Sequence, residues 1–384
     1  VSSNLASPTI LQNTRISRLM LKPLTKFPRS VLPSQEIRKL ITNRVIFSEA
    51  SLDPVQIQPS SIDLRLSSRA WRMRASFLPG RKRKVKTLID QLAMQEINLD
   101  KGYILEKGSV YLVKLQESLD LPGHIEALGN AKSSTGRLDL FTRLITDHST
   151  EFDRVNSRYS GPLYAEIAPN SFSVFARKGT MLNQIRFKIQ HDLKHKKSEI
   201  VENHKSINKQ IVGNHTPAKD FSINLRNPAN NLVGYKAKRH TDLIDLTKIN
   251  HYKIADFWDK VTTKRGRIVL DPGAFYILSS REYVSVPPKL AAEMAPYLSM
   301  IGEFRVHYAG FFDPGFGYSS NGSKKSRAVL EVRCHETPFV LEHGQTVGRL
   351  IFENMLSEPD LLYGKGVKSN YQGQSLKLSK HFKN

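Results

Sequence analysis

One short segment of this chain gathers side chains suited to binding an anion. Residues 132–137 read Lys-Ser-Ser-Thr-Gly-Arg, so two cations flank three hydroxyls and a glycine. Backbone amides and serine hydroxyls can cradle phosphate oxygens, and an arginine can hold them with two parallel hydrogen bonds. The segment predicts a loop that binds phosphate or orients a substrate, although such strings also occur in solvated turns.

Two glutamates could act as general bases. Glu166 and Glu331 each follow apolar residues of an expected strand, which predicts that both carboxyl groups are at least partly buried. Burial raises a carboxyl pKa towards the range that general acid–base catalysis uses. A structural glutamate paired with an arginine is the alternative, and the pattern alone does not decide between the two.

Two further polar segments could contribute to a site. Asp63 and Arg65 occupy alternate positions of an expected strand, so their side chains face the same side of the sheet. A buried Asp–Arg pair that serves only the fold explains them equally well. The C-terminal segment 369–382 is rich in Ser, Gln and Lys. It suits an arm that closes over an anion, and a plain basic disordered end is the alternative.

The chain repeats itself at a constant offset of 165 residues, so that Gly108 recurs as Gly273. The other identities at this offset are Tyr111/Tyr276, Glu117/Glu282, Pro122/Pro287, Glu166/Glu331, Gly179/Gly344 and Phe187/Phe352. Opposite the hydroxyl cluster, residues 297–302 of the second copy read Tyr-Leu-Ser-Met-Ile-Gly. The chain is therefore predicted to be a duplicated module in which only the first copy keeps the polar cluster.

Short strands separated by Gly and Pro must position these residues, which predicts a mainly β fold of two tandem barrel or jelly-roll modules. We expect short helices over 34–42 and 87–95. The expected strands are 103–105, 110–115, 163–167, 173–176 and 184–189, then 275–278, 283–286, 304–308, 328–332 and 349–352. The expected divisions are a disordered extension over 1–30, a first module over 31–190, a polar linker over 191–219 and a second module over 220–384.

Composition bounds the class of protein. The 384 residues carry a net charge of +23, and 39% of them are hydrophobic, as in a globular chain that attracts polyanions. The basic stretches 81–86 and 188–219 lack the interleaved aromatics that stack bases, so nucleic acid is not the favoured partner. Apolar runs long enough to span a membrane are absent from the sequence. The first 20 residues contain no Asp or Glu, as in a transit peptide, but a disordered extension is the preferred interpretation.

The cysteine count also excludes one class of site. Cys334 is the only cysteine, which rules out an internal disulfide and suggests a reducing compartment. It also excludes the His/Cys/Cys zinc site of zinc-dependent nucleotide deaminases.

Taken in order, the motifs resemble the deoxycytidine triphosphate deaminase family of the trimeric deoxyuridine triphosphatase-like superfamily. They are Gln58–Leu66, Lys132–Arg137, the Asp-Pro-Gly run at 313–315 followed by Leu330 and Glu331, and Tyr371–Gln374. The resemblance covers most of 31–382 and is greatest to tandem-module forms. It implies a dUTPase-like fold in each module, a homo-oligomer such as a trimer of tandem chains, and a cytoplasmic enzyme.

The resemblance also implies a reaction and a site. A glutamate activates water, which attacks C4 of dCTP to give dUTP and ammonia; Mg²⁺ accompanies the triphosphate and zinc is not used. Ser133 and Arg137 take the orienting roles, with Lys132 and Ser134 near the phosphates. The remaining residues expected to bind the nucleotide are Gln184, Ala309, Asp313, Phe316, Tyr371, Gln374 and Lys377.

The two copies depart from the family pattern in complementary ways. The first keeps the hydroxyl cluster but has Phe152 and Asp153 where Asp-Pro-Gly is expected, and the second keeps Asp-Pro-Gly but lacks the cluster. We therefore expect a composite site in which Ser133 and Arg137 meet Glu331 and the 309–316 hairpin. The rival assignment pairs Ser133 with Glu166. Hydrolysis of dUTP, a dUMP-forming deaminase and a non-enzymatic nucleotide or nucleic-acid binder remain alternatives.

Overall fold

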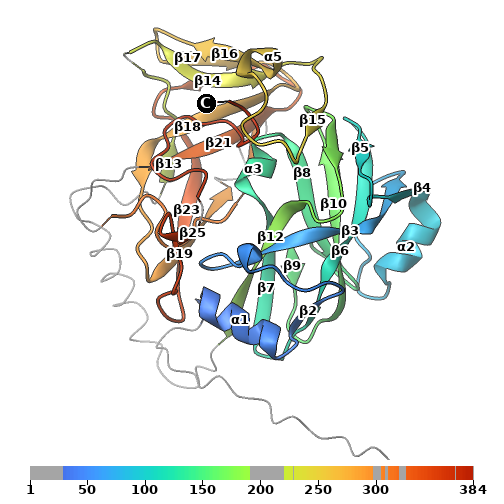
Figure 1. Cartoon of the computed structure of the whole chain (residues 1–384). Coiled ribbons are helices and arrows are strands. Elements are labelled where there is room, and N and C mark those ends of the chain that lie inside the picture. Colours follow the sequence, from blue (N-terminus) through green and yellow to red (C-terminus); the bar gives the residue numbers. More distant parts are fainter. Residues whose placement is uncertain are drawn as a thin grey trace, which may run out of the picture.

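The structure is a computed structural model that describes residues 29–190, 220–227, 229–296, 304–307, 310–319, 326–367 and 369–383. The two halves of the chain form two β modules that pack side by side, the first coloured blue to green and the second yellow to red in Figure 1. Among the described helices, none has the length and apolar character needed to cross a membrane.

The first half is built around one antiparallel sheet. The strands of this half are β1 (Arg29–Val31), β2 (Ile46–Ser48), β3 (Ile62–Met73), β4 (Ala93–Asn98), β5 (Tyr103–Leu105), β6 (Val110–Asp120), β7 (Ile125–Ala131), β8 (Leu140–Thr146), β9 (Arg154–Val155), β10 (Ser160–Pro169), β11 (Val174–Ala176) and β12 (Met181–Gln190). Neighbours in the ten-stranded sheet run β8-β10-β6-β3-β12-β7-β9, while β1, β2 and β4 pair with β12, β6 and β3.

The second half divides its strands among smaller sheets. They are β13 (Asp220–Ser222), β14 (Leu232–Ala237), β15 (Ile244–Asp245), β16 (Trp258–Thr262), β17 (Arg267–Leu270), β18 (Phe275–Val284), β19 (Leu290–Pro296), β20 (Phe304–His307), β21 (Ser326–Cys334), β22 (Phe339–Glu342), β23 (Thr346–Asn354), β24 (Leu362–Tyr363) and β25 (Gly366–Val367). The sheets run β16-β14-β18-β21-β20, β13-β23-β19, β17-β22 and β24-β25, while β15 joins β11 and β5 of the first half.

Short helices fill the gaps between strands. They are α1 (Ser34–Thr42), α2 (Val85–Leu92), α3 (Ser133–Gly136), α5 (Ile254–Phe257) and the 3₁₀ turn η1 (Pro54–Gln56). The helix predicted over 34–42 is confirmed. The one predicted over 87–95 was misplaced, because the chain becomes extended at Ala93 to pair β4 with β3. The strand predicted over 283–286 was also wrong as a separate element, since β18 runs on to Val284 through a register shift.

The repeat seen in the sequence recurs in the strand pairing. Equivalent strands pair in the same register at the same offset, as in Leu112–Glu166 and Ile277–Glu331, or Ala127–Phe187 and Ala292–Phe352. Gly108 and Gly273 both adopt positive φ, of 80° and 66°, in the turn that precedes the central strand. A residue with a β-carbon is strained in this conformation, which explains why glycine is kept in both copies.

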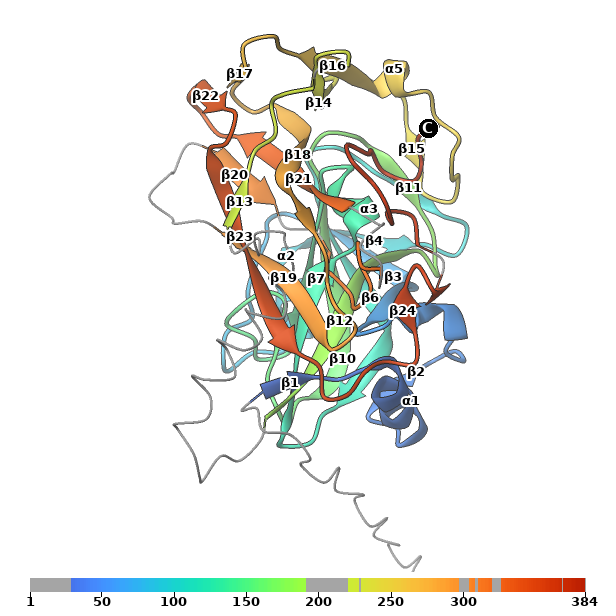
Figure 2. The same cartoon turned by 90° about the vertical axis from the view of Figure 1, so that its left-hand side faces the viewer.

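The C-terminal segment is part of the packed fold rather than a plain disordered end. Tyr371, Leu378 and Phe382 are 6%, 5% and 3% exposed. The ring of Phe382 contacts Phe257 edge-on, with ring centroids 5.5 Å apart, and the segment crosses from the second half onto the first. In both views this part of the chain lies near α3 and β21 (Figure 1 and Figure 2), so the fold brings the hydroxyl cluster of one half to the glutamate strand of the other.

Candidate active site

Arg137 lies at the centre of the contacts between the two halves. It follows α3 and is 3% exposed. One terminal nitrogen donates to Oε1 of Gln374 at 3.0 Å and to the carbonyl of Lys377 at 2.9 Å. Its guanidinium lies 3.7 Å from the centre of the Tyr371 ring, a cation–π arrangement. The first half therefore holds the C-terminal segment of the second through one buried cation.

The same guanidinium faces Glu331. This residue lies on β21 with its side chain 2% exposed, and its Oε1 is 3.9 Å from Nε of Arg137. Gly310, from the hairpin of the second half, lies so close to Ser133 that a β-carbon would collide with the serine hydroxyl. The Gly310 amide also donates to Oδ1 of Asn130 at 3.2 Å. The structure thus brings together Ser133, Arg137, Glu331 and the hairpin within one chain.

Glu166, the equivalent glutamate of the first half, has a different partner. Its side chain is 3% exposed and accepts hydrogen bonds from Arg143 on the neighbouring strand β8, including one from Nε at 3.1 Å. The Arg143 guanidinium lies 3.5 Å from the centre of the Phe152 ring. The prediction that both glutamates are buried is confirmed, and Glu166 sits in a salt bridge made within its own half.

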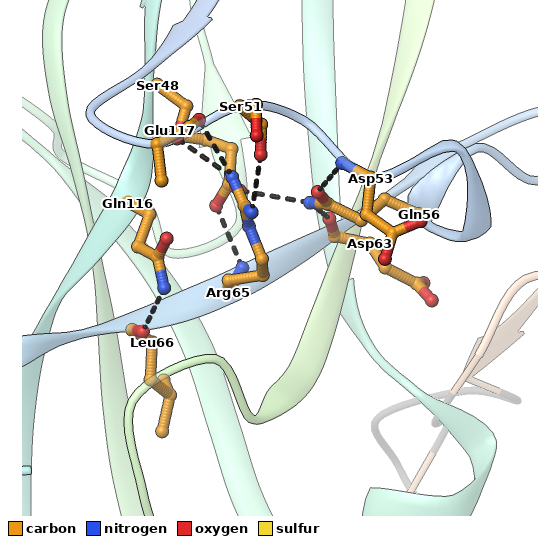
Figure 3. Close-up of polar contacts among 10 residues, drawn as sticks. Ser48, Ser51, Asp53, Gln56, Asp63, Arg65, Leu66, Gln116 and Glu117 are labelled. Carbon is orange, nitrogen blue, oxygen red and sulfur yellow. Dashed lines mark hydrogen bonds and ion pairs between the residues drawn. The ribbon is translucent and has the colours of Figure 1, made fainter. Parts of the chain in front are cut away.

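Asp63 and Arg65 bind different partners, so the structural alternative of an Asp63–Arg65 pair is wrong; Figure 3 shows the partners of Arg65. Arg65 binds the fully buried Glu117 of β6, with Nε 2.7 Å from Oε1 and its amide 2.8 Å from Oε2. Gln56 donates to Glu117 at 3.0 Å and to the Asp63 carbonyl at 2.8 Å. The Asp63 carboxylate is paired instead with Lys132 of the hydroxyl cluster. Burial raises the Asp63 pKa, and Lys132 opposes that rise.

The hairpin of the second half is seated on the first half through Asp313. Its carboxylate is 6% exposed and accepts a hydrogen bond from the Ser60 hydroxyl at 2.5 Å. Burial raises the Asp313 pKa, and Arg186 opposes that rise. Phe316 packs against Phe312, with ring centroids 5.3 Å apart. Ala309, also predicted to bind nucleotide, lies outside the described residues.

The remaining predicted residues are spread around this centre. Ser134 lies beside the C-terminal segment, its carbonyl accepting a hydrogen bond from Ser379 at 2.7 Å. Gln184 on β12 accepts one from Ser61 at 3.4 Å and pairs with Asn130 in the sheet. Among the described contacts, Gln184 reaches the hairpin only through Asn130, whose side chain accepts a hydrogen bond from the Gly310 amide. The carbonyl of Lys377 accepts a hydrogen bond from Arg137.

Comparison with known proteins identifies the family. Residues 28–191 match the 2'-deoxycytidine 5'-triphosphate deaminase N-terminal domain, and residues 189–382 match the C-terminal domain of the same family. The chain belongs to the dCTP deaminase family. A crystal structure of 2'-deoxycytidine 5'-triphosphate deaminase from Agrobacterium tumefaciens is similar at 47% identity with a TM-score of 0.79, covering 87% of this chain and 100% of that one.

Shorter relatives match part of the chain. A dUMP-forming dCTP deaminase from Methanobrevibacter smithii is 30% identical over 128 residues, which are 32% of this chain and 62% of that protein. One from Bifidobacterium longum is 34% identical over 110 residues, 28% of this chain and 53% of that protein. The chain thus spans between about half and two thirds of the length of these curated relatives.

This dCTP deaminase family member has a basic pocket of about 380 Å³ beside α3. Its polar and charged lining is Lys132, Ser134, Thr135, Arg177, Lys178, Thr180, Thr247, Lys380 and His381. Burial lowers the Lys380 pKa, and the neighbouring Lys132 lowers it further. Carboxylates are missing from the lining that the structure describes, so this pocket suits a polyanion.

Sequence reasoning missed Tyr363 and Arg186. Tyr363 packs on Phe316 with ring centroids 5.5 Å apart, and its amide donates to the Pro314 carbonyl at 2.8 Å. Burial raises its pKa. Gly364 and Gly366 were the available sequence signal for an ordered turn at Tyr363. In the structure both adopt positive φ in the tight turn between β24 and β25.

Proposed function

We propose that this chain deaminates dCTP at a site formed between its two halves. The proposal depends on one observation: Arg137 of the first half and Glu331 of the second are buried together, 3.9 Å apart. Two buried side chains of opposite charge beside a cluster of hydroxyls can bind a polar substrate and move a proton within a site closed to bulk water.

In the proposed reaction Glu331 takes a proton from a water molecule, and the resulting hydroxide forms a bond to C4 of cytosine. The proton taken from water passes to the ring nitrogen N3, where it stays; the hydroxyl proton of the C4 adduct then passes through Glu331 to the amino group, the C4–N4 bond breaks, and ammonia leaves. Water and dCTP thus become ammonia and the uracil nucleotide, without oxidation. Arg137 orients the Glu331 carboxylate, and the Ser133 hydroxyl beside Gly310 helps to orient the base and the water.

The triphosphate is assigned to the cationic side of the site. Lys132 and Ser134 line the basic pocket, which supplies positive charge without a lining carboxylate among the described residues. Mg²⁺ is expected to arrive as part of the substrate, because this ion is commonly held by phosphate oxygens and water. The described residues offer no group of three or more His, Cys, Asp or Glu side chains for a resident metal.

The two equivalent glutamates provide a matched test. Glu331→Gln and Glu166→Gln replace the carboxylate with a neutral amide at the same strand position of the two halves. We expect Glu331→Gln to lose activity by roughly 10²- to 10⁴-fold, the usual contribution of a general base. Glu166→Gln should stay active, since its partner is Arg143. A fully active Glu331→Gln enzyme would refute this assignment.

The product is a separate question. The Agrobacterium protein is described as a dCTP deaminase, whereas the curated relatives are described as dUMP-forming. Asp313 and Asp153 are the carboxylates that could activate water for hydrolysis of the triphosphate. We propose dUTP as the product, because Asp313 is held by Ser60 and Arg186 and Asp153 by the Leu144 amide. Incubation with Mg²⁺ and dCTP, with products resolved by chromatography, tests this. Release of dUMP and pyrophosphate would show the bifunctional reaction, and hydrolysis of dUTP without deamination would favour the triphosphatase.

We also propose that the chain forms a homo-oligomer. Strand β12 of the first half is covered by the second half, whereas its counterpart β23 carries Ile351 with 42% of its surface exposed. An exposed aliphatic side chain at this position suits a contact with a further chain. Light scattering of the purified protein tests the proposal, and a monomer at micromolar concentration would contradict it.

A further inference from the structure

Arg186 is a completely buried guanidinium between the two halves. It lies on β12, and its side chain has 0% exposure. One terminal nitrogen donates to the Ser60 hydroxyl at 2.9 Å and lies 3.5 Å from Oδ1 of Asp313. The other donates to the Ala292 carbonyl at 3.3 Å, and the guanidinium lies 4.0 Å from the centre of the Phe311 ring. The same nitrogen that binds Ala292 lies 3.7 Å from Oε2 of Glu353 on β23. Five contacts on the two halves thus converge on one cation.

These contacts surround the base of the hairpin. Phe311 and Asp313 belong to it, and Ala292 exchanges two backbone hydrogen bonds of 2.9 Å with Phe312. Ser60 completes a triangle, since its hydroxyl donates to Asp313 at 2.5 Å while accepting from Arg186. Arg186 therefore contacts the segment that carries Gly310 towards Ser133.

Arg186 is a costly way to hold two modules together. Removing a guanidinium from water costs several kcal/mol unless its partners are well placed. Nε of Arg186 has no hydrogen-bond partner among the described residues. The module fold itself does not require this arginine, because the equivalent strand position of the second half is Ile351. Apolar packing could serve the interface at lower cost, so retention of the cation indicates a more specific role.

We propose that Arg186 is a positioning residue for the reaction: it fixes Asp313 and thereby sets the hairpin 310–316 against Ser133. The inference rests on the proposed deaminase function. Without the Arg186 side chain, Asp313 would be a buried carboxylate with Ser60 as its remaining described hydrogen-bond partner. Asp63 of β3 adds a second negative charge nearby, and Tyr363 of β24 also faces this group.

Lys188 provides a matched control. It lies two residues along the same strand, and it too crosses to the second half, binding Glu353 at 2.6 Å and lying 3.6 Å from Glu293. Its contacts are with β19 and β23 and do not include the hairpin. Glu353 is a partner of both Lys188 and Arg186, so Arg186→Met and Lys188→Met each remove an ion pair with it, and only the first also removes the support of Asp313.

The experiment compares kcat/KM and its pH dependence for wild type, Arg186→Met and Lys188→Met. We expect Arg186→Met to lose on the order of 100-fold, as small misplacements in a site do, with Lys188→Met close to wild type. The acid limb of the profile should move to higher pH in Arg186→Met alone, because Asp313 keeps its proton longer without the cation. Arg186→Lys should restore part of the activity and of the profile. Equal losses in both Met variants with unshifted profiles would overturn the proposal.

A second readout does not depend on turnover. Hydrogen exchange of the Phe312, Gly315 and Phe316 amides reports the hairpin, since all three are bonded to backbone carbonyls. Faster exchange in Arg186→Met than in Lys188→Met supports positioning, and equal exchange refutes it. If wild type does not convert dCTP while the hairpin still loosens, the proposed function fails and the positioning stands. If Arg186→Met does not fold, Ser60→Ala removes the bridging hydroxyl while keeping the charge, and an unchanged hairpin and rate would count against the proposal.

Discussion

Asp153 offers a quantitative test of the electrostatics around the first-half glutamate. The residue lies just before β9 with φ of 63°, and its Oδ1 accepts a hydrogen bond from the Leu144 amide at 2.7 Å. Burial raises the Asp153 pKa to about 7. The Leu144 amide and Arg143 oppose that rise, and Glu166 adds to it. The neutral form of this carboxyl group is therefore favoured in the folded protein over much of the acid range.

The substitution Asp153→Asn removes the titration and keeps the acceptor oxygen, and asparagine tolerates positive φ. The folded pKa of about 7 exceeds the unfolded value of 3.8, so the wild-type carboxyl stabilises the fold at low pH. This contribution is lost as pH rises from about 4 through 7. A gap of roughly three units at 1.36 kcal/mol each is about 4 kcal/mol, of which ~2.5 kcal/mol falls between pH 5 and pH 8.

Urea unfolding of both proteins at pH 5 and pH 8 measures this difference. The free energy of unfolding of Asp153→Asn relative to wild type should rise by about 2.5 kcal/mol between the two pH values. Wild type serves as the control for every other titrating group, since these are common to both proteins. Parallel pH dependence in the two proteins would refute the assignment of a neutral, buried Asp153.

Three further substitutions test the contacts around the two glutamates. Arg143→Met should destabilise the fold by about 3–5 kcal/mol, because Glu166 is left buried without its cation, and the double variant with Glu166→Gln should recover most of that loss in urea unfolding. Arg137→Lys should lower kcat/KM by roughly 100-fold in the deamination assay, since a lysine cannot reproduce the planar guanidinium that donates to Gln374 and to the Lys377 carbonyl. Phe382→Ala should cost about 3–5 kcal/mol of packing and make the C-terminal segment more sensitive to limited proteolysis; equal cleavage rates in the variant and wild type would contradict this.

The repeat was the part of the fold that sequence could reveal. Shared glycines, prolines and strand residues kept a constant offset, and equivalent strands pair in the same register. Such positions are dictated by backbone geometry and local burial, which leave a readable pattern. Burial of Glu166 and Glu331 could be predicted for the same reason, because each lies within an apolar strand.

The partners of the charged residues could not be predicted from local pattern. Arg186 sits in an expected strand and looks like a surface residue, yet it is buried by Asp313, which is far away in the sequence. Arg65 pairs with Glu117 because the adjacent strand β6 offers a fully buried carboxylate. Ion pairing depends on which strands become neighbours, and local periodicity carries no such information.

The unequal loss of polar residues from the two copies has a physical explanation in the way they pack. Within one chain, Arg137 meets Glu331, while Glu166 is paired with Arg143 of its own half. Under the proposed assignment, a site made once per chain takes the hydroxyl cluster from one copy and the glutamate and hairpin from the other. The complementary residues are then free to change, and Arg143 and Phe152 occupy the surroundings of Glu166. One nucleotide bound per chain in equilibrium titration is therefore expected, and binding of two would show that the pairing around Glu166 also opens to substrate.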